Sequence, residues 1–168
     1  MLVVCRNMID FYTHRTVRWE DETVVMIDQR KLPQHVSYLE CRDYNQVAEA
    51  IKTMAVRGAP AIGVAAAMGL GLAAHTCKAK SREELINYLE MAGEVLRKTR
   101  PTAVNLFWAI KRVLDVASST VGDTEDIRVA VIKETQRMAD EDISINRRMG
   151  KYGASLIEDG DTVLTHCK

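Results

Sequence analysis

Residues 53–70 read Thr-Met-Ala-Val-Arg-Gly-Ala-Pro-Ala-Ile-Gly-Val-Ala-Ala-Ala-Met-Gly-Leu, and this stretch decides the fold around it. An arginine and a glycine stand just before Pro60, whose fixed φ suits the first position of a helix. No charged residue follows until Lys78. We therefore predict a buried core helix from Pro60 to about Cys77, since the uncharged run is short for a membrane span and dense in glycine and alanine.

The start of this helix is a candidate anion site. We expect the backbone amides of Ala61, Ile62 and Gly63 to point out of the helix with partial positive charge. Arg57 lies beside them and offers a fork of donors that suits phosphate or carboxylate. On spacing alone, a tight loop that packs one core helix onto another explains the stretch equally well.

Three glycines inside this helix, Gly63, Gly69 and Gly71, carry a second prediction. Each costs about 1 kcal/mol of helix stability relative to alanine. That cost is understandable where neighbouring backbone comes close, so we expect close helix packing at these positions.

A second arginine occupies a similar place further along the chain. Arg100 precedes Pro101 and is therefore biased toward extended backbone, and Thr102 is a candidate N-cap for another helix. Two arginines at two helix starts suggest two contacts with one anion. The alternative is that Arg100 only caps the carbonyls at the end of the preceding helix.

The N-terminal quarter of the chain is predicted to form a small antiparallel sheet. Its β-branched or alternating segments are separated by polar turns and by Pro33. The expected strands are Ile9–Tyr12, Thr16–Trp19, Thr23–Ile27 and Val36–Cys41.

Helical spacing dominates from residue 43 onward. Asp43 with Gln46 and Ser81 with Glu84 resemble capping boxes, which predicts helices from residue 44 to about 56 and from residue 81 to about 99. Thr124 is expected to cap a long helix that continues to about Ile157. A buried apolar stripe is predicted on that helix at Ile145, Met149, Tyr152 and Leu156.

The last ten residues predict a short strand, Thr162–Thr165, after a turn at Asp159-Gly160. Because a parallel strand needs neighbours and long crossovers, we expect this to be the first strand of a further domain that the sequence does not include. The expected fold is α+β, with a sheet region at 1–42, a helical bundle at 43–158 and a truncated Rossmann-like domain at 159–168.

Composition excludes several classes of function. The chain carries 23 basic and 23 acidic residues without a long basic run, which argues against nucleic-acid binding. Its four cysteines and four histidines are scattered, so we expect neither a metal site nor disulfides. The apolar run at residues 1–5 is too short for a signal peptide, so we expect a cytoplasmic protein with no membrane association. The acidic pair Glu141-Asp142 with Asn146 and Arg147 is expected to form a solvated face or a dimer contact.

Four segments together resemble methylthioribose-1-phosphate isomerase, in the superfamily that includes the regulatory subunits of translation initiation factor 2B and ribose-1,5-bisphosphate isomerase. The resemblance covers the whole chain in order. It rests on Val56–Gly63, Arg100–Ala109, Glu141–Asn146 and Leu164–Cys167.

The resemblance implies a specific reaction: an aldose–ketose isomerisation in methionine salvage, from 5-methylthioribose 1-phosphate to 5-methylthioribulose 1-phosphate, with no dissociable cofactor. It implies that Arg57, Gly58, Ala59 and Arg100 bind substrate, that Cys167 is the active-site cysteine, and that the protein is a homodimer. The family's general-acid aspartate would lie in the absent domain. The family usually has Asn after His-Cys, where this chain has Lys168.

Two other functions fit the same resemblance. One is ribose-1,5-bisphosphate isomerase, which also acts on a phosphorylated sugar. The other is a non-catalytic regulatory subunit of the initiation factor 2B type. The intact segments around Arg57, Arg100 and Cys167 favour the methylthioribose enzyme, and the 168 residues alone are expected to be inactive.

Overall fold

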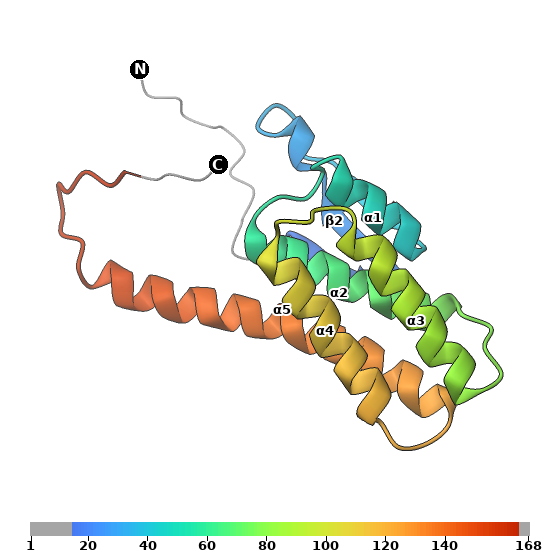
Figure 1. The fold of residues 1–168 in the computed structure, drawn as a ribbon. Coiled ribbons are helices and arrows are strands. Elements are labelled where there is room, and N and C mark those ends of the chain that lie inside the picture. Colours follow the sequence, from blue (N-terminus) through green and yellow to red (C-terminus); the bar gives the residue numbers. More distant parts are fainter. Residues whose placement is uncertain (1–14, 165–168) are drawn as a thin grey trace.

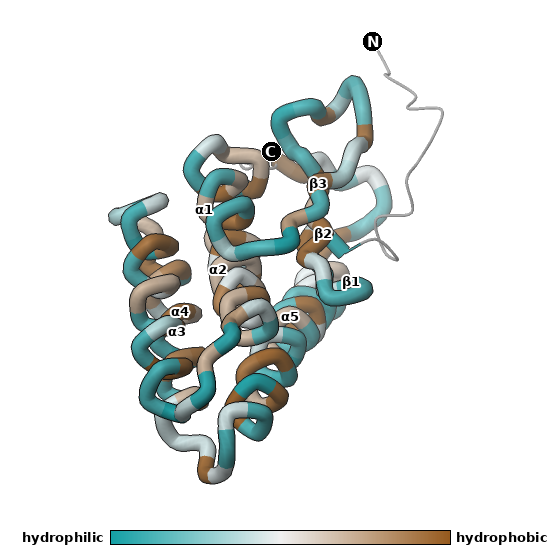
Figure 2. The backbone as a smooth tube through the Cα atoms, turned by 90° about the vertical axis from the view of Figure 1, so that its right-hand side faces the viewer, coloured by the Kyte–Doolittle hydropathy of each residue, from teal (hydrophilic) through white to brown (hydrophobic). Residues whose placement is uncertain are grey.

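A computed structural model describes residues 15–164, which form a three-stranded antiparallel sheet followed by helices packed around a central one (Figures 1 and 2). The strands are β1 (Val17–Glu20), β2 (Thr23–Ile27) and β3 (Tyr38–Cys41), with a short 3-10 helix η1 (Gln29–Lys31) between the last two. The α-helices are α1 (Tyr44–Lys52), α2 (Ala59–Thr76), α3 (Arg82–Arg97), α4 (Val104–Ser119) and α5 (Thr124–Ala154).

The sheet confirms the predicted strands within the described residues. Its order is β1-β2-β3, and Glu20 pairs with Thr23 across a two-residue turn. Both turn residues, Asp21 and Glu22, have positive φ, as a type I′ hairpin requires. The predicted strand Ile9–Tyr12 lies outside the described residues.

Helix α2 is the centre of the structure, as the uncharged sequence predicted. It is long and apolar enough to cross a membrane by composition, yet 72% of its 18 residues are buried inside the protein. Figure 2 shows it between the sheet on one side and α3 and α4 on the other. The burial identifies α2 as a core helix.

The glycines of α2 mark close contacts, but only one of them meets backbone. A Cβ on Gly63 would lie 3.1 Å from the carbonyl oxygen of Asn105 in α4. At Gly69 the nearest atoms are side-chain atoms of Val47 and Leu96, so the expected backbone approach is wrong there. Gly71 likewise faces side chains, the ring of Trp19 and Thr135.

The capping predictions hold for α1 and α3. The Asp43 side chain accepts hydrogen bonds from the amides of Asn45 and Gln46, and the Ser81 hydroxyl accepts one from Glu84. Both helices therefore begin where the sequence places them. Their last residues, Lys52 and Arg97, come four and two residues before the expected ends.

Two predicted caps are wrong by one residue. Ala103, not Thr102, is the N-cap of α4, because the Ala103 amide donates to the Arg100 carbonyl and closes a turn before the helix starts. At α5 the cap is Asp123, which accepts from the amides of two following residues and forms a capping box with Asp126. Thr124 is the first helical residue.

The C-terminal part of α5 differs most from prediction. The helix extends past the bundle at the end where α2 and α4 begin (Figure 1). The stripe expected to be buried is exposed: Ile145 by 45%, Met149 by 58%, Tyr152 by 74% and Leu156 by 83%. The helix also ends at Ala154 instead of Ile157.

The predicted strand Thr162–Thr165 is absent over its described residues, 162–164. A strand is defined by hydrogen bonds to a neighbour, and no strand of the described chain lies beside this segment.

We predict that Arg128→Met lowers the free energy of unfolding by about 2 kcal/mol, since hydrogen bonds to a charged group contribute about 1.5–3 kcal/mol. The Arg128 guanidinium donates to the carbonyls of Ala74, Cys77 and Ala79, at 3.1, 2.8 and 3.3 Å, and so covers the C-terminal end of α2. Urea unfolding would measure the change, with Arg42→Met, an exposed arginine on the sheet side, as the control.

Candidate functional site

The loop before α2 is held in a shape that needs Gly58. This residue is the N-cap of α2 with φ of +92°, and a Cβ placed on it would meet nothing within 4 Å. The backbone angle, not crowding, therefore selects glycine here. Ala59 and Pro60 follow as the first helical residues, and the Ile62 amide already donates to the Gly58 carbonyl at 2.9 Å. Of the three amides expected to be free, those of Ile62 and Gly63 are thus used within the helix, which leaves only that of Ala61.

Arg57 lies at the exposed edge of this loop. Its Nε donates to the Met54 carbonyl at 3.3 Å, and its own carbonyl accepts from the Gln29 amide group at 3.5 Å. No carboxylate within residues 15–164 pairs with the guanidinium. The charge of Arg57 is therefore available to a ligand.

Arg100 is half-buried in the turn that leads into α4. In the described chain its guanidinium makes neither a hydrogen bond nor an ion pair. The end of α3 is closed without it, because the Thr99 hydroxyl donates to the Leu96 carbonyl at 2.6 Å. The alternative in which Arg100 caps that helix is therefore wrong.

The structure brings these two arginine loops to the same end of the bundle. The contact between Gly63 and the Asn105 carbonyl places the first turns of α2 and α4 side by side (Figure 1). Each arginine precedes one of these helix starts. Arg57, Gly58 and Ala59 therefore lie at the same end of the bundle as Arg100, and their role as one anion site stays a prediction.

The starts of α2 and α4 also lack the caps that the other helices have. Asp43, Ser81 and Asp123 accept amide hydrogen bonds at α1, α3 and α5. Neither α2 nor α4 has a side-chain cap or an acidic residue in its first turn. Their first amides therefore remain donors for an outside acceptor, and the macrodipoles add positive potential. Sequence reasoning missed the uncapped start of α4 because it assigned the cap to Thr102.

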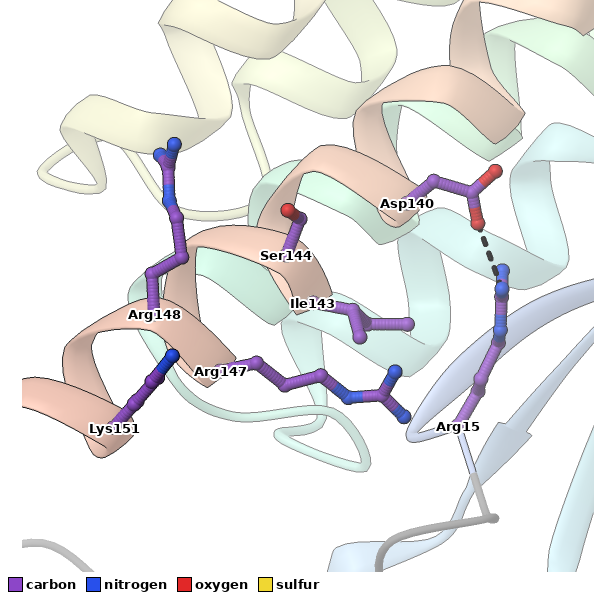
Figure 3. Close-up of a pocket in the computed structure, with 7 residues that line it drawn as sticks. All are labelled: Arg15, Asp140, Ile143, Ser144, Arg147, Arg148 and Lys151. Atoms are coloured by element: carbon purple, nitrogen blue, oxygen red, sulfur yellow. Dashed lines mark ion pairs between the residues drawn. The ribbon is translucent and has the colours of Figure 1, made fainter. Parts of the chain in front are cut away.

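A second basic surface lies on the part of α5 that extends past the bundle. It is a pocket of about 420 Å³ lined by Arg15, Asp140, Ile143, Ser144, Arg147, Arg148 and Lys151 (Figure 3). An ion pair of 2.7 Å joins Arg15 to Asp140, and the lining contains one carboxylate and four cationic side chains. Sequence reasoning did not identify this pocket, since Arg15 and α5 are far apart in the chain.

The acidic residues of α5 have a different role from the one expected. Glu141 binds Arg112 of α4 through two hydrogen bonds, of 2.7 and 3.1 Å, so it is more than a solvated residue. The dimer contact stays a prediction. Asn146 donates to the backbone and side-chain oxygens of Asp142 within α5. These bonds tie α5 to α4 and stabilise the helix itself.

Cys167, the predicted catalytic residue, lies outside the described residues. Of the other cysteines, Cys41 is buried, and burial raises the pKa of its thiol to about 11. A thiol with such a pKa is a poor nucleophile at neutral pH. Residues 15–164 contain no cluster of three or more His, Cys, Asp or Glu that could hold a metal ion.

Asp28 stabilises the segment that supports the Arg57 loop, which gives a pH prediction. The Arg30 guanidinium donates to the buried Asp28 carboxylate at 2.7 Å and holds the pKa of Asp28 below its usual 3.8. Arg30 also donates to Thr53 in that loop, at 3.2 Å. A lowered folded-state pKa means that this stability is present above about pH 4 and is lost as the pH falls further.

We therefore expect Asp28→Asn to lower the free energy of unfolding by about 1–2 kcal/mol at pH 7, with a lower melting temperature, and by less at pH 3. Thermal unfolding followed by circular dichroism at both pH values measures this. The exposed Asp115→Asn change in α4 is the control, and a pH-independent effect of Asp28→Asn would contradict the assignment.

A family profile and an individual relative place the chain in the same family. The profile of the Initiation factor 2 subunit family matches residues 55–168. A methylthioribose-1-phosphate isomerase of Geobacter metallireducens is 48% identical over 154 residues, which are 91% of this chain and 44% of that protein. The chain therefore spans less than half the length of this relative.

Two solved structures share the fold. The 5-methylthioribose 1-phosphate isomerase of Pyrococcus horikoshii has a TM-score of 0.83 and 46% identity, over 87% of this chain and 41% of its own. A structure titled translation initiation factor eIF-2B, subunit delta, from A. fulgidus has a TM-score of 0.81 and 44% identity, over 88% of this chain and 43% of its own. These likenesses confirm the resemblance and the α+β fold class that the sequence predicted.

Proposed function

Because the chain belongs to the Initiation factor 2 subunit family, we propose that it forms the phosphate-binding part of an isomerase that converts 5-methylthioribose 1-phosphate to 5-methylthioribulose 1-phosphate. One observation supports this above the others. Two arginines without carboxylate partners flank two adjoining helix starts that lack caps. Such a site suits a phosphate group.

The chemistry gives these residues a clear task. A phosphate on the anomeric oxygen prevents the sugar ring from opening as a free hemiacetal would. An acid must therefore protonate the ring oxygen before a hydrogen moves between C1 and C2. Arg57 and Arg100 hold the phosphate in our proposal, and Cys167 acts at the reacting carbons. We assign the acid to no aspartate of these 168 residues.

The setting of this activity is part of the proposal. We place it in the cytoplasm, in a homodimer that binds neither nucleic acid nor membrane, and we expect no turnover by the 168 residues alone. The balanced charge of the chain argues against nucleic-acid binding, and the burial of α2 within the bundle argues against a membrane span. The homodimer rests on the family resemblance.

Phosphate binding by the chain itself tests the site. We would titrate the ¹⁵N-labelled protein with inorganic phosphate and with 5-methylthioribose 1-phosphate and follow its amide resonances. We expect shifts at Ala59, Ala61 and Asn105, and binding at least about 10-fold weaker in Arg57→Gln and Arg100→Gln. Arg42→Gln is the control. Shifts confined to the basic pocket on α5 would contradict the site.

A measurement of isomerase activity tests which substrate the protein uses. We would fuse the chain to the remaining region of the Geobacter metallireducens relative and assay isomerisation, with Cys167→Ser alongside. We expect activity in the fusion, its loss in the variant, and none in the unfused chain. A folded fusion without activity on 5-methylthioribose 1-phosphate would favour ribose 1,5-bisphosphate or a regulatory subunit, a possibility to which the eIF-2B-like structure gives weight.

A further inference from the structure

The loop that carries Arg57, residues 53–58, is bonded to η1, which lies 23 to 28 residues earlier in the chain. The backbone amide of Gln29 in η1 donates to the Ala55 carbonyl at 2.8 Å. The side-chain amide of the same residue reaches the Arg57 carbonyl at 3.5 Å. One residue of η1 therefore contacts two carbonyl groups of the loop.

Arg30 of η1 makes a further contact with this loop. Its Nη1 donates to the Thr53 hydroxyl oxygen at 3.2 Å. Its Nε and Nη2 donate to the two carboxylate oxygens of Asp28, at 2.7 and 2.8 Å. Asp28 is only 1% exposed, and its own amide donates to the Ser37 carbonyl at 2.9 Å. A buried, anchored carboxylate therefore fixes the direction in which Arg30 reaches the loop.

The contacts from η1 lie on either side of a residue with an unusual backbone conformation. Met54 has φ of +58°, which non-glycine residues seldom adopt. Such a conformation persists where the surrounding structure holds it. The Ala55 amide, which donates to the Ala50 carbonyl at 2.9 Å, closes the turn from the side of α1. Arg30 and Gln29 hold it from the other side, at Thr53 and Ala55.

The orientation of Met54 affects the position of Arg57. The Met54 carbonyl accepts a hydrogen bond from the Arg57 Nε at 3.3 Å, so the guanidinium follows this carbonyl if the turn moves. A guanidinium that already has the required orientation loses less conformational freedom when it binds phosphate, and it binds more tightly for that reason.

We propose that Arg30 is a positioning residue: through Thr53 it keeps the Arg57 loop in its phosphate-binding shape before a ligand arrives. The inference rests on the proposed function, because that function assigns Arg57 to the phosphate. It deepens the proposed function by extending the site to η1, which supports the loop from the sheet side.

Thr53→Val tests the contact, because it removes the hydroxyl and leaves the pair of Arg30 with the buried Asp28 in place. Thr120→Val is the matched control. Thr53 and Thr120 are the C-caps of α1 and α4, and each hydroxyl donates to the carbonyl four residues earlier at 2.7 Å. Within residues 15–164, however, no arginine donates to the Thr120 hydroxyl.

Binding of inorganic phosphate to the ¹⁵N-labelled 168-residue chain is the first measurement. Thr53→Val should weaken it at least about 3-fold, and Thr120→Val should leave it unchanged. Arg57→Gln then distinguishes positioning from a general loss of structure. If Thr53 acts through Arg57, adding Thr53→Val to Arg57→Gln should change the affinity by less than about 1.5-fold. A general loss of structure would weaken binding in both backgrounds.

A measurement without ligand separates this inference from the proposed function. The ¹H–¹⁵N NOE of the Arg57 Nε–H group reports its motion on the picosecond to nanosecond scale. We expect a lower NOE in Thr53→Val and an unchanged one in Thr120→Val. Equal NOE values in the two variants would overturn the inference, as would equal weakening of phosphate binding with and without Arg57. Phosphate binding that Arg57→Gln leaves unchanged would instead contradict the proposed function, and the NOE would still decide whether Arg30 orders the loop.

Discussion

Replacing Arg112 with methionine is expected to lower the free energy of unfolding by about 2–3 kcal/mol, which is the largest loss of stability that we predict. Arg112 of α4 donates to Glu134 at 2.6 Å and to both oxygens of Glu141, and its guanidinium lies 5.4 Å from the centre of the Trp108 ring. Glu134 is only 7% exposed. Without Arg112 this buried carboxylate keeps, among the described residues, only the exposed Arg137, which donates to it at 2.9 Å, and part of its desolvation cost is no longer offset.

The neighbouring residue supplies a matched control. Lys111 also forms an ion pair with a carboxylate, Asp115, but both side chains are exposed. Lys111→Met should therefore change stability by less than about 1 kcal/mol. Urea unfolding of both variants measures the difference between the two losses of stability. Equal effects would show that burial of Glu134 is unimportant, and Glu134→Gln in the Arg112→Met background should recover part of the loss.

Acid should weaken the same network in the unmodified protein. The hydrogen bonds from Arg112 hold the pKa of Glu141 below its usual value of 4.5. Because the folded-state pKa is lowered, the contribution of Glu141 is present above about pH 4.5 and is lost as the pH falls through the folded value. The penalty of Arg112→Met should accordingly shrink at low pH.

Local signals in the sequence predicted most of the secondary structure. Asp43 and Ser81 identify helix starts because a cap acts on amides two or three residues away. The start of α4 was misplaced because the hydrogen bond between Ala103 and the Arg100 carbonyl depends on the turn around Pro101, which no single residue announces. Periodicity gave the apolar face of α5 correctly. Its burial was wrong because periodicity identifies a face and not what covers it.

The sequence supplied the candidate residues of the site but not the arrangement of the loops that carry them. Arg57 and Arg100 stand out in the sequence, and the structure brings their loops together through the contact of Gly63 with Asn105. Nothing local in the sequence specifies that contact between positions 42 residues apart. The network of Arg112 with Glu134 and Glu141 was missed for the same reason, since it joins two helices whose spacing is set by the whole core.

The other large effect is expected in catalysis by the fusion with the remaining region of the Geobacter metallireducens relative. Each of Arg57→Gln and Arg100→Gln should lower kcat/KM about 10- to 150-fold, the range for hydrogen bonds to a charged group. Neither guanidinium is bound to a carboxylate within residues 15–164, so the loss comes from the substrate and not from a broken ion pair. Unfolding midpoints should stay close to that of the unchanged fusion.

The double variant shows whether the two arginines hold one phosphate. If both contact the same group, the loss of one lets the phosphate shift, and removing the second then costs less. The combined decrease should therefore fall short of the product of the single decreases by a factor of at least about 2, which corresponds to a coupling near 0.5 kcal/mol. Fully multiplicative decreases would place Arg57 and Arg100 on separate groups of the substrate, and unchanged kcat/KM in either single variant would remove that arginine from the site.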